Sequence, residues 1–215
     1  MELYLDGVVQ EAESRESSYV YEMEDYATLR RDTSGLRPSF VLAEFAAGLD
    51  LPDNVTDNPK IKALEDAVND WVSWTNVSNR TTNKFLIVHW LTNLTQDVFS
   101  YAKEQTVDGT HNLVVVLMRE HNIELQSAMD LAGQRCIDCI TKFEEIRQIL
   151  PTWGAEVDQQ VARYVQGLQN WIVGSLYWSF ACRRYFGSQA ESVKRGGIIR
   201  FGANFLNNDY VVQHQ

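Results

Sequence analysis

An apolar stripe at helical spacing is the feature that most restricts the fold of this chain. From Pro59 onward, apolar residues recur at intervals of three and four, which places them on one face of an α-helix: Ile61, Leu64, Ala67, Val68, Trp71 and Trp74. Long helical patterns also cover 123–149 and 157–186, and strand-like alternation is absent. Because the 215 residues include only 4 prolines, the sequence predicts an all-α fold.

Shorter helices are expected before and between these long ones, at 2–14, 22–31, 39–48 and 113–118. In the first of them, Leu3, Leu5, Val8 and Val9 are the apolar residues, and Glu11, Glu13 and Arg15 are expected on the outside. The second is predicted to end at the sequence "DTSG", because Asp, Thr, Ser and Gly favour caps and turns. The segment "LDLPDNVTDNP" is predicted to be a loop, and no element is assigned to the tail at 188–215.

Composition excludes several classes of partner. A net charge of −10 and a pI near 4.8 argue against binding to nucleic acid or to an anionic membrane. The apolar run at Phe85–Leu91 is too short to span a bilayer, and the first residues do not resemble a signal peptide. The three cysteines suggest a reduced, cytoplasmic protein, and the pair Cys136 and Cys139 is read as ordinary helix packing. The sequence carries no indication of an oligomeric state.

The block Val77–Gln96 interrupts the helix that begins at Pro59. Helical periodicity stops at Val77 and returns at Asp97. Removing the block restores a continuous helix, and the block can be back-translated to contain a splice donor, a branch point and an acceptor. We therefore interpret it as a translated intron, with a genuine insertion loop as the alternative. A cDNA read across the codons for Asn76 and Asp97 distinguishes the two, because an intron is absent from the mature transcript.

The same deletion aligns three oxygen-bearing side chains. Ser100 and Glu104 are four residues apart and share a helix face. Gln96 occupies the preceding turn in the chain as written, and it is a poor Mg²⁺ ligand there because its side chain is too long. With the block removed, Asn76 takes that place and completes the row Asn-Asp-x-x-Ser-x-x-x-Glu. An ordinary solvated helix face is the alternative for Ser and Glu at this spacing.

Three segments together resemble the class I terpene synthases, specifically the fungal sesquiterpene cyclases. They are "YATLRRDTSGLRPSFVLAEF", the rejoined "WTNDVFSYAKEQTVDG", and "YVQGLQNWIVGSLYWSFACRRYFG". The resemblance covers residues 1–76 and 97–187. It implies a class I terpenoid synthase helical bundle and a Mg²⁺-dependent lyase of fungal secondary metabolism. The expected reaction is the ionisation and cyclisation of a prenyl diphosphate, with farnesyl diphosphate as the expected substrate.

The resemblance also implies roles for individual residues. Asn76, Ser100 and Glu104 match the ligands of one Mg²⁺ ion. Lys103 matches a diphosphate contact in the same motif.

Four further positions match residues around the substrate. Arg184 and Tyr185 match a pair that binds the diphosphate. Arg30 matches an arginine that senses it, and Arg31 is the alternative one residue later. Trp178 matches an aromatic residue that faces the pocket, where its ring can stabilise carbocations.

The chain also departs from the family. It contains no DDxxD/E motif, which the family uses to bind its other metal ions. We therefore expect residues 1–187 to be a partial cyclase domain that lacks its N-terminal helices, is interrupted at 77–96, and has little or no cyclase activity. The alternative is a non-catalytic all-α binding or interaction protein.

Overall fold

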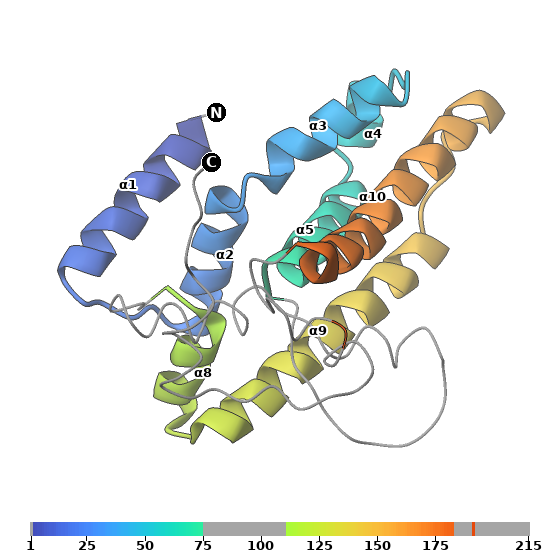
Figure 1. The fold of residues 1–215 in the computed structure, drawn as a ribbon. Coiled ribbons are helices and arrows are strands. Elements are labelled where there is room, and N and C mark those ends of the chain that lie inside the picture. The colour runs from blue at the N-terminus through green and yellow to red at the C-terminus, as the bar shows by residue number, and fades with distance from the viewer. Residues whose placement is uncertain (1, 75–110, 183–190, 192–215) are drawn as a thin grey trace, which may run out of the picture.

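The computed structural model describes residues 2–74, 111–182 and 191, and within them all regular structure is helical (Figure 1). The helices are α1 (Glu2–Glu16), α2 (Met23–Thr33), α3 (Leu36–Ala46), α4 (Asp53–Thr56), α5 (Pro59–Trp74), α8 (Leu113–His121), α9 (Leu125–Gln148) and α10 (Ala155–Ala181). The all-α prediction is confirmed. None of these helices is long and apolar enough to cross a membrane.

Two element predictions need correction. The segment predicted to be a loop contains the short helix α4, whose first turn forms because the Pro52 carbonyl accepts the N–H groups of Val55 and Thr56 at 2.8 and 3.2 Å. The last long helix was predicted to reach Phe186, but α10 ends at Ala181 and the backbone of Cys182 is extended (ψ 141).

Local sequence signals explain several helix ends. α2 stops where the sequence predicted: Gly35 adopts a left-handed φ of 74, and the hydroxyl of Ser34 accepts the N–H of Leu36 at 3.1 Å. Asn112 caps the start of α8, because its side-chain oxygen accepts the Val114 N–H at 2.9 Å.

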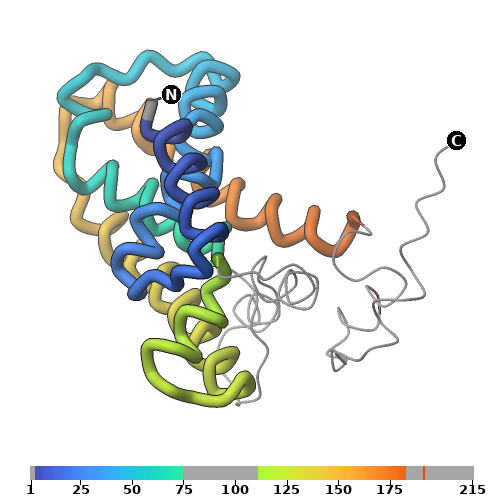
Figure 2. Tube along the Cα trace, turned by 90° about the vertical axis from the view of Figure 1, so that its left-hand side faces the viewer, coloured from blue at the N-terminus to red at the C-terminus, as the bar shows by residue number. Residues whose placement is uncertain are grey.

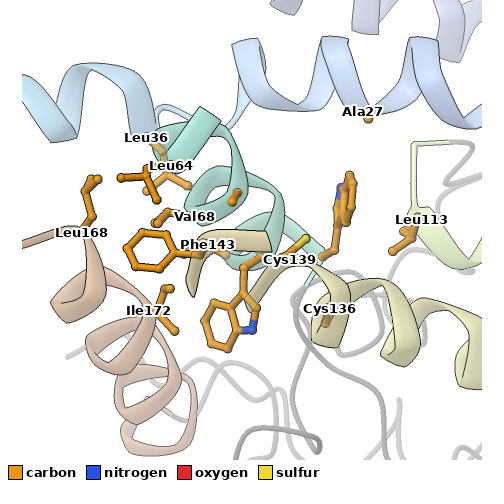
Figure 3. Close-up of a cluster of buried hydrophobic side chains, with 14 of the residues drawn as sticks. Ala27, Leu36, Leu64, Val68, Leu113, Cys136, Cys139, Phe143, Leu168 and Ile172 are labelled. Carbon is orange, nitrogen blue, oxygen red and sulfur yellow. The ribbon is translucent and has the colours of Figure 1, made fainter. Parts of the chain in front are cut away.

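Helix α5 forms the centre of the core. It contacts α2, α3, α4, α9 and α10, and all six residues of its predicted apolar stripe are buried. Figure 3 shows the ring of Phe143, from α9, among Val68 of α5 and Leu168 and Ile172 of α10. The stripe was therefore a correct guide to the buried face of this helix.

Helix α1 packs differently from the prediction. Its apolar residues lie in solvent, with Leu3 63% and Leu5 57% exposed, while Gly7 and Ser14 are buried. A Cβ atom at Gly7 would lie 3.0 Å from the Cγ2 atom of Thr33, at the end of α2. Gly7 therefore allows a close approach between α1 and α2, and the buried Ser14 lies beside His111, with 3.4 Å between Oγ and Nδ1.

The two cysteines of the C-x-x-C sequence lie within α9 and belong to the hydrophobic core. Both Cys136 and Cys139 are buried free thiols. Burial raises the pKa of the Cys139 thiol, so it stays protonated. Residues 2–74 and 111–182 hold no group of three metal-ligating side chains, and the cysteines fit the packing role expected for them.

Candidate functional site: an apolar cavity with one cationic residue

A cavity of about 820 Å³ lies where the α2–α3 break faces α5 and α10. Its volume is in the range typical of small-molecule binding sites. Val72 and Ser73, from the last turn of α5, line it together with Ser34 and Gly35 of the break. The short turn at Gly35 thus brings two helix ends to the same cavity.

The walls combine small side chains with tryptophan rings. α3 contributes Leu36, Ser39, Ala43 and Ala46, and α10 contributes Gly167, Asn170, Trp171, Gly174, Ser175 and Trp178. On α10, the two glycines are seven residues apart and so are the two tryptophans, which places all four on one side of the helix. The glycines leave space beside the rings, so the cavity is wide and has aromatic walls.

Helix α3 turns Ser39, Ala43 and Ala46 toward the cavity and exposes three large apolar residues. Val41, Leu42 and Phe45 are 64%, 66% and 82% exposed, and none of them lines the cavity. The exposed residues lie on a side of the helix next to the one that lines the cavity, since Leu42 is four residues before the lining residue Ala46.

Arg30 is the one charged residue among the described residues that line the cavity. It lies in the last turn of α2. A guanidinium group carries a permanent positive charge and presents a planar set of donors that suits phosphate oxygens. The described walls therefore combine an apolar surface with a single cationic group, an arrangement that suits an amphipathic anion.

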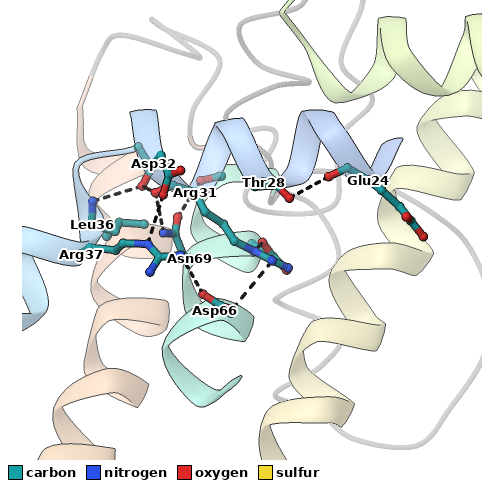
Figure 4. Close-up of polar contacts among 11 residues, drawn as sticks. Glu24, Thr28, Arg31, Asp32, Leu36, Arg37, Asp66 and Asn69 are labelled. Carbon is teal, nitrogen blue, oxygen red and sulfur yellow. Dashed lines mark hydrogen bonds and ion pairs between the residues drawn. The ribbon is translucent and has the colours of Figure 1, made fainter. Parts of the chain in front are cut away.

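Arg31 is engaged elsewhere, in an ion pair with α5. Its Nε and Nη2 atoms donate to the two carboxylate oxygens of Asp70, each at 2.6 Å, and Asp66 lies 3.7 Å away. Figure 4 shows the Arg31 side chain directed toward α5, where Asp66 and Asn69 lie. Arg31 does not line the cavity. Hydrogen bonding to Asp70 raises the pKa of Arg31, so the guanidinium remains charged.

Trp178, which the sequence analysis expected to face the pocket, lines the cavity. Its exposed fraction is 48%. It lies in the last turn of α10, the part of the helix that extends beyond the other helices in Figure 2. Trp171 also lines the cavity and was missed. Its ring meets Phe40 edge-to-face, with centroids 6.3 Å apart. The seven-residue spacing from Trp178 was the signal that could have identified it.

The remaining predicted site residues lie outside the described residues. These are Asn76, Ser100, Lys103, Glu104, Arg184 and Tyr185. The proposed insert at 77–96 and the tail at 188–215 also fall there, apart from Glu191. Helix α5 reaches Trp74, two residues before Asn76, and its last turn lines the cavity.

Comparison with known proteins identifies the family. Residues 1–142 match the family model described as "Terpene synthase family 2, C-terminal metal binding". The chain therefore belongs to the terpene synthase family, and the resemblance predicted from its motifs is confirmed.

Curated relatives from fungi are similar over most of the chain. It is 42% identical over 200 residues to sesquiterpene synthase Agr3 of Cyclocybe aegerita, covering 93% of this chain and 50% of that protein. It is also 42% identical over 197 residues to alpha-muurolene synthase of Coprinopsis cinerea, covering 92% of this chain and 42% of that protein. The chain thus spans about half the length of the curated relatives it matches.

Solved structures confirm the fold. An a-eudesmol synthase has a TM-score of 0.65 at 22% identity, covering 84% of this chain and 53% of that one. A linalool/nerolidol synthase from Streptomyces clavuligerus has a TM-score of 0.67 at 20% identity, covering 82% and 55%. The described helices therefore adopt the arrangement found in terpene synthases.

Proposed function

We propose that this chain is the part of a sesquiterpene cyclase that binds the diphosphate of a prenyl diphosphate, with farnesyl diphosphate as the substrate. The single observation that carries the proposal is the cavity, whose described walls are apolar and aromatic apart from a few polar groups and one cation, Arg30. A prenyl diphosphate has the matching character, with a long hydrocarbon chain and an anionic end. The fungal sesquiterpene synthases among its relatives support the same substrate class.

The residues of this chain have separate roles in the proposed reaction. Arg30 donates hydrogen bonds to diphosphate oxygens and offsets the charge that develops as the allylic C–O bond breaks. The electron pair of that bond leaves with the diphosphate, and an allylic cation remains in the cavity. The rings of Trp171 and Trp178 can stabilise such a cation through their π-faces. The apolar walls limit contact between the cation and water.

We propose Mg²⁺ as the metal cofactor, held by Asn76, Ser100 and Glu104. The description of the matching family model as metal binding supports a metal in this region, and oxygen ligands of these types suit Mg²⁺. When bound, the ion would neutralise charge on the diphosphate leaving group. We assign Lys103, Arg184 and Tyr185 to the same diphosphate, with Arg30 in preference to Arg31.

We further propose that residues 1–187 form a partial cyclase domain in which Val77–Gln96 is a translated intron. The chain spans about half of its curated relatives, so cyclisation requires a longer polypeptide. The chain itself is expected to bind diphosphate with little or no turnover.

Binding of pyrophosphate tests this function without requiring turnover. Titration calorimetry with and without Mg²⁺ is applied to the full chain and to a variant that lacks Val77–Gln96. We expect Mg²⁺-dependent binding, stronger in the shortened variant. Because a hydrogen bond to a charged group is worth about 1.5–3 kcal/mol, Arg30→Ala should weaken binding about tenfold or more. Glu104→Ala should abolish the Mg²⁺ dependence.

Arg37→Ala is the matched control. Arg37 lies in the first turn of α3, pairs with Asp32 and Asp66, and does not line the cavity. Its replacement should leave pyrophosphate affinity unchanged. If neither form binds pyrophosphate, the alternative of a non-catalytic helical binding protein is favoured, which the exposed apolar face of α3 would suit.

A further inference from the structure

A pair of contacts from α5 fixes the last turn of α2. The first is the two-pronged ion pair between Arg31 and Asp70, with both N–O distances at 2.6 Å. Asp70 is only 5% exposed. Because the planar guanidinium fork matches the carboxylate, this pair restricts rotation as well as distance.

The second contact holds the backbone of the same residue. The side-chain amide of Asn69 donates to the main-chain carbonyl of Arg31 at 3.0 Å. Carbonyls in the last turn of a helix need partners from outside the helix, and this one also accepts the hydroxyl of Ser34 at 3.1 Å. In turn, Ser73 donates to the Asn69 oxygen at 3.3 Å. Asn69 and Ser73 are both fully buried, so the network is part of the interior.

These contacts determine where the neighbouring residue points. Successive side chains on an α-helix are about 100° apart. With the side chain and carbonyl of Arg31 both held on α5, the direction of Arg30 is set, and Arg30 lines the cavity. Ser73 belongs to this network and lines the same cavity. The network therefore couples the cationic residue of the cavity to α5.

We propose that Asp70 and Asn69 are positioning residues, which fix the rotation of the end of α2 so that Arg30 is held in the cavity before an anion binds. The inference rests on the proposed function, in which that anion is a diphosphate. Fixing the backbone at Arg30 restricts the directions that its side chain can take, so less conformational freedom is lost when an anion binds. A role in stability alone would leave anion affinity unchanged in any variant that folds.

A double-mutant cycle separates positioning from stability. Pyrophosphate affinity in the presence of Mg²⁺ is measured on the full chain for Asp70→Asn, for Arg30→Ala, and for both together. We expect Asp70→Asn to weaken binding about tenfold in the presence of Arg30 and less than about twofold in its absence. The losses are non-additive because Asp70 acts only through Arg30.

Two further variants protect the test against failure to fold. Arg31→Met combined with Asp70→Leu removes the ion pair as a unit, and such apolar replacements of buried pairs are often neutral or stabilising. We expect the same loss of affinity with a native helical spectrum. Asp66→Asn is the matched control. Asp66 lies one turn before Asp70 on α5 and also faces Arg31, but at 3.7 Å and without the two-pronged contact. It should change affinity less than about twofold.

The binding results distinguish a failure of the proposed function from a failure of the positioning inference. If the unaltered chain does not bind pyrophosphate, or if Arg30→Ala has no effect, the proposed function of Arg30 is wrong and this inference is lost with it. If binding depends on Arg30 but the folded Asp70 variants bind normally, only the positioning inference is overturned. Additive losses in the Arg30→Ala background, or an equal loss in Asp66→Asn, overturn it as well.

Discussion

Two phenylalanines of this chain offer a direct test of where its core lies. Phe143 of α9 is 2% exposed, whereas Phe45 of α3 is 82% exposed. Both lie in helices, so Phe→Ala makes the same chemical change in the same backbone conformation. The substitutions should therefore differ only in what surrounds each ring.

The expected magnitudes follow from burial. Replacing a fully buried Phe by Ala costs about 3–5 kcal/mol of unfolding free energy, because it removes apolar contacts and leaves a cavity. Because Ala has a higher helix propensity than Phe, each substitution also stabilises its helix by about 0.5 kcal/mol. Phe45 has little buried surface to lose, so Phe45→Ala should change stability by about 0.5 kcal/mol or less. Because the propensity gain is common to both sites, the two variants should differ by about 3–5 kcal/mol.

Urea denaturation followed by circular dichroism measures both variants. Phe143→Ala should lower the midpoint with an unchanged m-value, and its Tm should fall by about 5–18 °C, whereas Phe45→Ala should leave both near the wild-type values. A loss at Phe45 as large as that at Phe143 would refute the reasoning, because it would mean that the outer face of α3 is packed.

Two other substitutions test the polar contacts of the fold. Burial raises the pKa of Glu65, which accepts the Tyr164 hydroxyl at 2.5 Å. The folded state therefore holds this proton more tightly than the unfolded state, and its contribution to stability is lost as pH rises above the ordinary value of 4.5. The Glu65→Gln variant cannot titrate at this position, so the difference in unfolding free energy, variant minus wild type, should increase between about pH 4 and about pH 7 in urea titrations. A difference that does not change with pH would contradict the raised pKa of Glu65. Asn112→Ala removes the cap of α8 and should cost about 1 kcal/mol in the same assay, while Asn112→Ser, which keeps a capping oxygen without adding a charge at this fully buried position, should cost less.

Sequence periodicity predicted the buried face of α5 but not that of α1. In α5 the apolar residues follow one helical stripe, and all six are buried. In α1 the apolar residues Leu5 and Val9 are both 57% exposed and do not share the face of Gly7 and Ser14, which are buried. The close approach at Gly7 depends on the position of Thr33, which is far away in the sequence. No local pattern contains that information.

The candidate site shows the same division. The motif containing Arg30 and Arg31 could be located, and the distance to Asn76 favoured Arg30; the ion pair that holds Arg31 on Asp70, 39 residues away, could not be predicted. Trp178 could be placed by its motif. Trp171 was missed because a tryptophan in an apolar helix is ordinarily a core residue; its seven-residue spacing from Trp178 indicated a shared face, and the packing of α10 against α3 shows that this face lines the cavity.

The buried thiols of α9 give the protein an internal reporter. A thiol reagent reacts with a cysteine only when the ionised sulfur can reach it. Cys136 and Cys139 are buried in the core, while Cys182, after the end of α10, is partly accessible. The labelling of the two core cysteines is therefore limited by how often α9 separates from its neighbours. The modification rate of these two cysteines therefore measures how often the core around α9 opens, without any engineered probe.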